Sequence, residues 1–277
     1  MIDTLFLSGG SSKGFAYIGS FKYLIDEGIF KNIKNIISCS IGSFVAIIMS
    51  MNINHDLLIT IMINIKPNYD IDHINIDNLF NRHGLFKNVI FYSILKYLFK
   101  YKYGVEKLTL KELYDHTGIN NEIKVYNYTK RCGEYYNHIN HPNIDVALLL
   151  TAATSIPLIN EYVIYNGDYL LDGGINGSYP FLNKKKYKNY IGIKLSDNCN
   201  HDSNDIFDLI QLVFLNASDE TANVFINNNK RIITIHCKGI QSMFNFELSN
   251  DMIQNLINIG YDTIKEFVDN NKKLFTK

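Results

Sequence analysis

The chain has 277 residues and contains no tryptophan, only four prolines and only four cysteines. The cysteines, Cys39, Cys132, Cys199 and Cys237, lie far apart and form no CxxC pair. This spacing predicts neither a disulfide framework nor a zinc site, and reduced thiols in a reducing compartment are expected. The Asp and His residues also show no metal-ligand spacing, so neither a metal nor another cofactor is expected.

The chain also lacks an excess of charge of either sign. Lys and Arg together number 27, and so do Asp and Glu. Proteins that bind nucleic acid usually carry a basic face, so this balance gives no reason to expect a nucleic-acid partner.

Long apolar runs are missing as well. No stretch reaches the roughly 18 uncharged apolar residues that a membrane-spanning helix needs. The first seven residues contain Asp3 and only a short apolar run, so they predict a first strand and not a signal peptide. We therefore expect a cytoplasmic protein or one that is peripheral at membranes.

What the chain does contain is apolar segments of strand and helix length, within a composition that is 47% hydrophobic. Their periodicity predicts strands at residues 4–7, 33–38, 123–130, 135–138, 190–195 and 232–237. It predicts helices at residues 14–27, 42–51, 146–153, 206–226 and 250–274. A hairpin is expected at residues 162–171, turning at Asn166-Gly167. The early order of strand, loop, helix, strand, turn and helix predicts a parallel sheet covered by helices.

No internal repeat, proline-rich linker or change of composition divides the chain, so a single domain over residues 1–277 is expected. Its core is placed at about residues 1–195, with a mostly helical, lid-like insert at about 55–117 and a strand and helices in residues 196–277. Within the insert, residues 86–103 are rich in aromatic residues and lysine. They fit an interfacial helix laid on a membrane, but apolar residues cover more than one face, which favours a packed or lid helix.

The first candidate site is a glycine-rich loop that follows the first strand, Ser8-Gly9-Gly10-Ser11-Ser12-Lys13-Gly14. Its spacing fits neither the dinucleotide-binding pattern nor the P-loop. Small residues between a strand and a helix present consecutive N–H groups, which suit either a phosphate or an oxyanion. A simple turn with positive φ at Gly9 or Gly10 is the structural alternative.

The second candidate site is Ser38-Cys39-Ser40-Ile41-Gly42, which lies between a strand and a helix. A serine on such a turn is held out of the backbone, and the N-terminus of the following helix stabilises developing negative charge. The alternative is a serine in a helix-capping turn. Cys39 is interpreted as a small buried residue and not as a nucleophile.

The third candidate site is Asp172-Gly173-Gly174. The two glycines leave room for a substrate or a nucleophile beside the carboxylate, although an Asp-Gly turn is the commoner use of that dipeptide. Asp168 competes for the same role.

These three segments, in this order, resemble the patatin-like phospholipase family. That family carries a G-G-G-x-[KR]-G loop, then a G-x-S-x-G elbow and later a D-G-[GA] element. The loop and the helix after it match apart from Ser11, and the elbow matches apart from Ser38; each of these serines stands where the family has glycine. Ala152-Ala153-Thr154-Ser155-Ile156-Pro157 resembles the family's small-residue stretch, and the likeness runs to about Leu195.

The resemblance implies a three-layer α/β/α fold with a mainly parallel sheet and a lipid acyl hydrolase of phospholipase A or lysophospholipase type. Ser40 would be the nucleophile and Asp172 its general base, without a histidine. The implied oxyanion hole is formed by Gly9, Gly10 and Ser11. Supporting positions in the loop and elbow are Lys13, Gly14, Ser38, Gly42, Gly173 and Gly174. The implied substrate is a phospholipid or another acyl lipid, with peripheral membrane contact; the oligomeric state is left open.

Alternatives remain at this point. Ser40, Asp172 and His236 follow the chain order of an α/β-hydrolase triad, although that fold places several strands before its elbow. Ser11 and Ser38 could weaken catalysis, which would leave a lipid-binding or membrane-associating protein on the same fold. Ser11 in particular is tolerable only if its φ need not be positive. Transfer of the acyl group to an alcohol uses the same acyl-enzyme as hydrolysis does.

Overall fold

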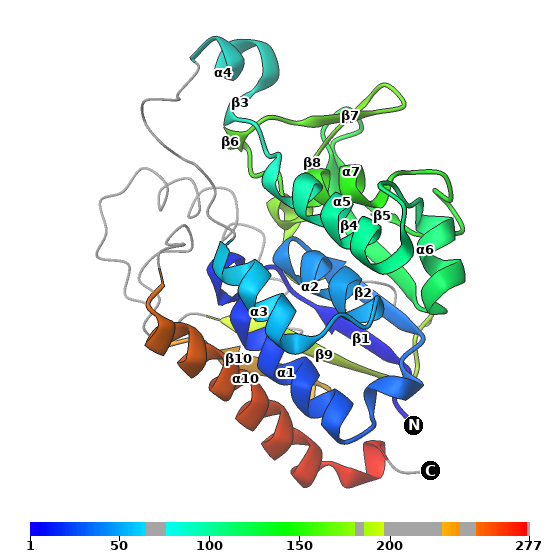
Figure 1. The fold of residues 1–277 in the computed structure, drawn as a ribbon, viewed down its shortest axis with the longest axis vertical. Helices are drawn as coiled ribbons and strands as arrows, with labels where there is room; N and C mark the ends of the chain where they lie inside the picture. Colours follow the sequence, from blue (N-terminus) through cyan, green and yellow to red (C-terminus); the bar gives the residue numbers. More distant parts are fainter. Residues whose placement is uncertain (65–75, 181–185, 197–228, 239–247, 276–277) are drawn as a thin grey trace.

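A single mixed sheet forms the centre of the molecule (Figure 1). The computed structural model describes residues 1–64, 76–180, 186–196, 229–238 and 248–275. Along the sheet the strands are ordered β10-β9-β1-β2-β4-β8-β7, and β5 pairs with the outer part of β4. The strands are β1 (Thr4–Leu7), β2 (Asn35–Cys39), β4 (Asn120–Asn127), β5 (Cys132–Tyr136), β7 (Val163–Tyr165), β8 (Asp168–Asp172), β9 (Tyr190–Ser196) and β10 (Ile232–His236).

The five strands β10, β9, β1, β2 and β4 are parallel, which confirms the predicted mainly parallel sheet. Leu7 at the end of β1 is paired with Ser38 of β2 and with Ile193 of β9. The loops that follow β1 and β2 therefore leave the sheet at the same edge, next to each other. Among the antiparallel strands, β5 pairs with the edge of β4 that faces away from β2, whereas β8 follows β2 along the same edge of β4 and β7 pairs with β8.

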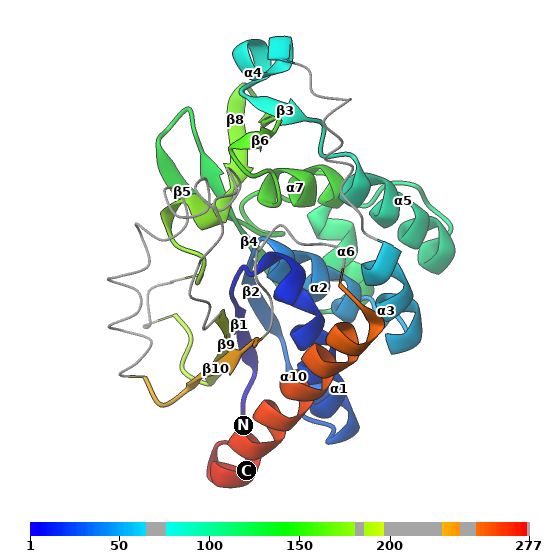
Figure 2. The same cartoon turned by 90° about the vertical axis from the view of Figure 1, so that its left-hand side faces the viewer.

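Helices α1, α2, α7 and α10 pack on one face of this sheet, as Figure 2 shows from the side. Successive side chains of β1 point to opposite faces of the sheet. Leu5 and Leu7 therefore join the large core under these helices, whereas Phe6 joins a smaller cluster on the other face. The expected helix at residues 206–226 lies outside the described residues. The helices are α1 (Phe15–Asp26), α2 (Ile41–Ser50), α3 (His55–Asn64), α4 (Ile76–Arg82), α5 (Ile90–Tyr103), α6 (Leu110–Thr117), α7 (Val146–Ala153) and α10 (Asn250–Asn270), with short 3-10 turns at Ser11–Gly14, Phe30–Asn32, Gly173–Asn176 and Lys272–Leu274.

The segment expected as a helical insert is helical for most of its described length, but it also contains strand β3 (Gly84–Phe86). This strand pairs in parallel with β6 (Leu158–Asn160), and the amide of Glu161 donates to the carbonyl of Phe86 at 2.9 Å. Three residues carry too little periodicity to be recognised as a strand in the sequence.

Helix α5 packs as an ordinary core helix along one side. Phe91, Leu95, Leu98 and Phe99 are buried in the main core, whereas Tyr97 and Tyr101 are exposed. This agrees with the favoured interpretation of residues 86–103 as a packed helix. No helix in the part of the chain that the structure describes is both long and apolar enough to cross a bilayer.

The hairpin β7–β8 turns where the sequence predicts it. Asn166 has φ 52° and Gly167 has φ 86°, the two positive values of a type I′ turn. Such a turn matches the twist of the flanking strands, and it directs β8 back along β4 toward Asp172.

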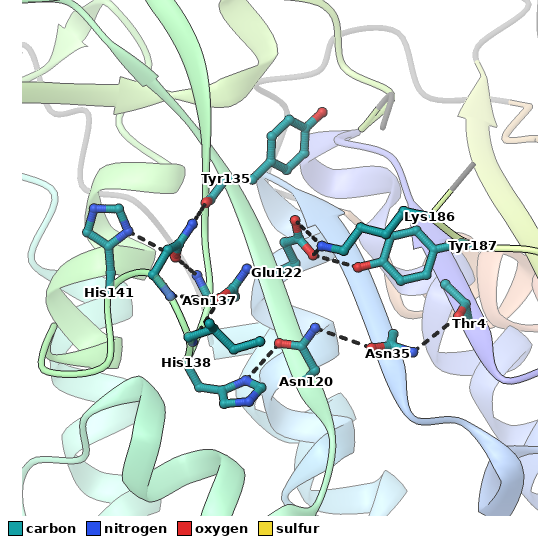
Figure 3. Close-up of polar contacts among 12 residues, drawn as sticks. Thr4, Asn35, Asn120, Glu122, Tyr135, Asn137, His138, His141, Lys186 and Tyr187 are labelled. Carbon is teal, nitrogen blue, oxygen red and sulfur yellow. Dashed lines mark hydrogen bonds and ion pairs between the residues drawn. The ribbon is translucent and has the colours of Figure 1, made fainter. Parts of the chain in front are cut away.

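The amino ends of the parallel strands are tied together by polar side chains (Figure 3). Asn35 Nδ2 donates to Thr4 Oγ1 at 3.3 Å, and Asn120 Nδ2 donates to Asn35 Oδ1 at 3.2 Å. The row continues to the ring of His138, whose Nδ1 lies 2.9 Å from Asn120 Oδ1. On the same strand as Asn120, the buried Glu122 pairs with Lys186 at 3.0 Å. These contacts lie at the opposite edge of the sheet from the loops that follow β1 and β2.

Helices α1 and α10 touch through two glycines. A Cβ on Gly19 would lie 1.8 Å from the carbonyl oxygen of Ile257, and a Cβ on Gly260 would lie 1.9 Å from that of Ala16. Both distances are impossible for a side chain, so the two backbones meet directly. The C-terminal helix is thereby fixed against the helix that follows the glycine loop.

We expect Gly260→Ala to lower the free energy of unfolding by about 1–3 kcal/mol, because the added methyl forces α10 away from α1. Urea denaturation would measure the loss. Asn255→Ala, at an exposed position of the same helix, is the matched control and should cost nothing. A Gly260→Ala protein as stable as the control would contradict the direct backbone contact.

Candidate active site

Ser40 occupies a strained turn between β2 and α2. Its φ of 52° and ψ of −128° lie outside the regions that a serine normally adopts. Such a residue costs on the order of 1–3 kcal/mol and persists only when its surroundings hold it in place. The turn points the Ser40 hydroxyl away from the backbone, whereas the neighbouring Cys39 is fully buried, as expected.

The elbow at Ser40 is pressed against the glycine loop. A Cβ on Gly42 would lie 2.6 Å from the carbonyl oxygen of Ser8, so only glycine allows α2 to start this close to the end of β1. A Cβ on Gly9 would lie 3.2 Å from the Cβ of Ser40. Both glycines therefore bring two segments from different strands into one site.

The glycine loop departs from its sequence-based interpretation in two respects. The amide of Gly9 donates to the carbonyl of Ser178 at 2.8 Å, so Gly9 lines the site with its N–H already engaged. Positive φ falls on Ser11, at 48°, and not on Gly9 or Gly10 as the turn alternative expected. Within the described residues, the amide of Gly10 has no hydrogen-bond acceptor.

A buried network supports the loop from below. The Tyr17 hydroxyl donates to the carbonyl of Ser8 at 2.7 Å, and the amide of Leu195 donates to Ser8 Oγ at 3.0 Å. Burial raises the pKa of Tyr17 far above its usual range, so its hydroxyl keeps its proton and remains a donor.

Asp172 lies at the end of β8 and is 2% exposed. The Ser40 hydroxyl donates to its Oδ2 at 2.6 Å, and the amide of Gly174 donates to its Oδ1 at 2.7 Å. Its own amide donates to the carbonyl of Ser155 at 2.8 Å, within the small-residue stretch after α7. Burial raises the pKa of Asp172 to about 6, against the opposing effects of these hydrogen bonds and of the charge on Lys124.

Lys124 is a site residue that sequence reasoning missed. It lies in the middle of β4, is almost fully buried, and donates from Nζ to the carbonyls of Gly177 at 2.6 Å and Asn176 at 3.2 Å. These carbonyls end the 3-10 turn that begins at Gly173, directly after Asp172. A lysine inside a central strand was the available signal, because lysine is seldom fully buried without a partner.

The other predicted supporting residues lie around this centre. Gly14 contacts Ile41 at the start of α2, and Gly173 lies against the backbone of Lys124. Lys13 is buried in the 3-10 turn after the loop. Ser38 is buried in β2, and its hydroxyl has no hydrogen-bond partner among the described residues.

The structure separates the two competing residues from Ser40. Asp168 lies at the start of β8, near the hairpin turn, where Lys130 and Asn127 hold its pKa below the usual range. His236 ends β10, and β9 and β1 lie between that strand and β2. At about 4.8 Å per strand, this separation amounts to roughly 14 Å.

Replacement of Asp172 by asparagine should increase stability at alkaline pH. The raised pKa means that the folded state favours the neutral carboxyl of Asp172. The contribution of this carboxyl to the free energy of unfolding is therefore fully present below about pH 4, and it is lost as the pH rises through about 6. Asparagine stays neutral, and we expect Asp172→Asn to gain on the order of 2 kcal/mol at pH 8 and little at pH 4. Urea denaturation at both pH values would measure the difference.

The matched control is Asp168→Asn, which replaces a carboxylate whose pKa is lowered by Lys130 and Asn127. The Asp168→Asn protein should be less stable than the unsubstituted protein at pH 8, whereas Asp172→Asn should be more stable. An Asp172→Asn protein that is less stable than the unsubstituted protein at pH 8 would contradict the burial penalty.

Solved structures with low sequence identity share this fold. VipD from Legionella pneumophila aligns with a TM-score of 0.62 at 15% identity, over 97% of this chain and 67% of VipD. The type III effector protein ExoU aligns with a TM-score of 0.53 at 11% identity, over 97% of this chain and 53% of ExoU. The ExoU–SpcU complex from Pseudomonas aeruginosa gives 0.51 at 11% identity, over 99% of this chain and 52% of the matched one.

Two viral proteins match in sequence. "Probable lipid hydrolase 463L" of Invertebrate iridescent virus 6 is 26% identical over 201 residues, 70% of this chain and 67% of that protein. "Uncharacterized protein R571" of Acanthamoeba polyphaga mimivirus is 26% identical over 212 residues, 74% of this chain and 68% of that protein. The family model described as "Patatin-like phospholipase" matches residues 5–183, a range that includes the glycine loop, the Ser40 elbow and Asp172. The chain belongs to the patatin-like phospholipase family.

Proposed function

We propose that this protein hydrolyses fatty-acyl esters of phospholipids or lysophospholipids through a serine acyl-enzyme. Membership of the family supports a hydrolase that acts on lipid esters, and the name of the iridescent-virus relative agrees with it. The observation that carries the mechanism is the 2.6 Å hydrogen bond from the Ser40 hydroxyl to Asp172. It joins a serine on a strained elbow to a buried carboxylate whose pKa is raised to about 6.

In the first half of the reaction, Ser40 Oγ attacks the ester carbonyl carbon while Asp172 takes the hydroxyl proton. The carbonyl oxygen becomes an oxyanion. When the tetrahedral intermediate collapses, the bond to the alcohol oxygen breaks, and that oxygen takes the proton from Asp172 as it leaves. The products of this half are the acyl-enzyme and a lysolipid or glycerol-phosphodiester alcohol.

In the second half, Asp172 deprotonates a water that attacks the acyl carbon. Collapse of the second intermediate breaks the bond to Ser40 Oγ, which regains its proton from Asp172, and the fatty acid is released. An alcohol that takes the place of this water gives transacylation by the same route.

The oxyanion is assigned to the amides of Gly10 and Ser11. The Gly10 amide has no acceptor among the described residues and follows Gly9, which lies against Ser40. The amide of Gly9 donates to Ser178, so Gly9 is proposed to line the site without donating to the substrate. Backbone donors of this kind typically contribute a factor of 10²–10³ each in rate.

A dyad accounts for the geometry better than a triad does. Asp172 accepts the hydrogen bond from Ser40 directly, so no imidazole stands between them. In a triad the carboxylate would face a histidine ring nitrogen, and the histidine would face the serine. His236 is separated from β2 by two strands.

A second candidate function has some support in the loop and elbow. Ser11 has positive φ where the family has glycine, and the buried hydroxyl of Ser38 has no partner in the described part of the chain. The positive φ strains the backbone at Ser11, and burial of the Ser38 hydroxyl without a partner costs free energy. They favour a lipid-binding protein whose catalysis is weakened, a candidate that the following experiment separates from the first.

We expect the protein to release fatty acid from a panel of phospholipids and lysophospholipids, and Ser40→Ala and Asp172→Asn to reduce the rate by about 10³-fold or more, since each removes a reacting group. His236→Ala is the control and should keep most of the activity. A fluorophosphonate probe should label the unsubstituted protein and not Ser40→Ala.

Two results would change this assignment. Folded protein that neither takes the label nor releases fatty acid would favour the weakened lipid-binding protein. A folded but inactive His236→Ala protein would replace the dyad by the triad.

Lys124 should set the pH at which activity appears. The base works as a carboxylate, so activity should rise with pH through the pKa of Asp172, near 6. Lys124→Met removes a cation that lowers this pKa, and we expect the midpoint of the kcat/KM profile to move upward by up to about one pH unit. The loop held by Lys124 should also loosen, which lowers kcat.

Lys186→Met is the matched control, because Lys186 binds Glu122 on the same strand and does not touch the turn after Asp172. It should leave the midpoint where it is. An unchanged midpoint in well-folded Lys124→Met would show that Lys124 has a structural role only.

A further inference from the structure

One end of the molecule carries a group of exposed, large apolar side chains. We call it the apolar tip; its members are Phe80, Tyr128, Leu158, Ile164 and Tyr169. Figures 1 and 2 show that α4, β6, β7 and β8, which carry four of them, gather at the end opposite to the two chain termini. Phe80 is 76% exposed, although its helix α4 packs next to strand β3.

Aromatic contacts join parts of the tip into one surface. The rings of Tyr162 and Tyr169 lie 4.5 Å apart, and His83 lies 5.5 Å from Tyr162 and 6.2 Å from Tyr128. The amide of Tyr128 donates to the carbonyl of Tyr169 at 2.8 Å. Ile164 is paired with Tyr169 across the hairpin. His83, directly after α4, is thus held together with the β4–β5 turn and with the β7–β8 hairpin.

The tip projects past the edge of the sheet at which Ser40 lies. Cys39 is paired with Lys124, and the next residue of β4, Val125, is paired with Asp172. Tyr169 comes three residues before Asp172 on β8, which places it roughly 10 Å farther out at 3.3 Å per residue. A flat surface that touches the tip would therefore lie over the edge of the sheet at which Ser40 and Asp172 meet.

Leu158 gives a second, independent sign that this surface has a role. It has φ 67° and is 40% exposed. For a bulky residue this conformation is an outlier, and exposed positions with positive φ normally carry glycine or asparagine. The chain instead holds a leucine in a strained conformation that exposes its apolar side chain to solvent.

The charges around the tip favour an anionic surface. The Arg82 side chain is 57% exposed while its partner Glu161 is 9% exposed. Lys130 is 52% exposed, while its two partners Asp168 and Glu134 are 22% and 25% exposed. Arg131 is exposed as well. The carboxylates of these pairs are turned inward and the cations outward, although the exposed Asp77 of α4 opposes them.

We propose that the apolar tip is the surface with which the protein lies on an anionic lipid bilayer while the site takes its substrate from that bilayer. Tyrosines suit the headgroup region, because the ring is apolar and the hydroxyl is polar. Phe80, Leu158 and Ile164 enter the acyl boundary, and Arg82 and Lys130 meet anionic headgroups. The proposal rests on the proposed function, since it names where that site meets its substrate.

The test is flotation with vesicles of phosphatidylcholine alone and of phosphatidylcholine with phosphatidylserine. It uses the full chain with Ser40→Ala, so that hydrolysis does not change the vesicles. The tip variant combines Phe80→Ser, Leu158→Asn and Ile164→Thr. We expect it to bind anionic vesicles at least about tenfold more weakly, because binding scales with the apolar area inserted.

The matched control is Ile139→Ser combined with Tyr101→Ser. Ile139 is 75% exposed and lies in the turn after β5, where its amide donates to Asn137 at the other edge of the sheet. The control should bind vesicles as the parent protein does. Leu158→Asn alone should keep or raise the melting temperature, since asparagine tolerates positive φ, while it weakens vesicle binding.

Several results would overturn the proposal. The first is equal vesicle binding by the tip variant and its parent. The second is a control that loses as much vesicle binding as the tip variant does, and the third is a parent protein that binds no vesicles. Self-association that the tip variant abolishes would identify a second copy of the chain as the occupant. Hydrolysis of a water-soluble ester by the unsubstituted protein tests the proposed function separately, because that substrate requires no bilayer.

Discussion

The site depends on one constraint, which is that a carboxylate must be kept out of water and within hydrogen-bond distance of a serine hydroxyl from another strand. Ser40 leaves the sheet after β2, and Asp172 ends β8, which continues along the same edge of β4 because β5 occupies the other edge. The strand β4 therefore fixes their separation, since it is paired with both neighbours. Its buried residues Ile123 and Val125 anchor it in the core, so the distance between the Ser40 hydroxyl and the Asp172 carboxylate is set by sheet register.

Burial of Asp172 has a cost, because water no longer solvates its charge. The amide of Gly174, the hydroxyl of Ser40 and the nearby ammonium of Lys124 offset part of it and keep the pKa near 6 instead of higher. Lys124 is itself buried and satisfied by two carbonyls of the following turn. The Asp172 carboxylate and the turn beside it are thus held by the same strand, which fixes the position of the proposed base and keeps its pKa near neutral.

The sequence was sufficient for the order of strands and helices around the loop, the elbow and the hairpin, because glycines and apolar periodicity mark them. Short motifs predicted Ser40 and Asp172 as one site, and the structure brings these two side chains within hydrogen-bond distance. The engagement of the Gly9 amide by Ser178 could not be predicted, since it joins segments 169 positions apart through a backbone carbonyl that carries no sequence signal. Strand β3 and the carbonyl partners of Lys124 likewise emerged only with tertiary pairing, in which long-range contacts decide between local alternatives.

Backbone strain in this molecule is concentrated where chemistry or contact is proposed. Ser40 and Ser11 have positive φ within the site, and Leu158 has it at the tip. Strain of this kind survives only when surrounding structure fixes the chain on both sides. Ser40 has buried β2 before it and the wholly buried α2 after it, and α1 behind the glycine loop is fixed in turn by α10 through Gly19 and Gly260. The helices packed on this face of the sheet therefore fix the loops that follow β1 and β2. This support allows Ser11 and Ser40 to keep unfavourable backbone conformations within the site.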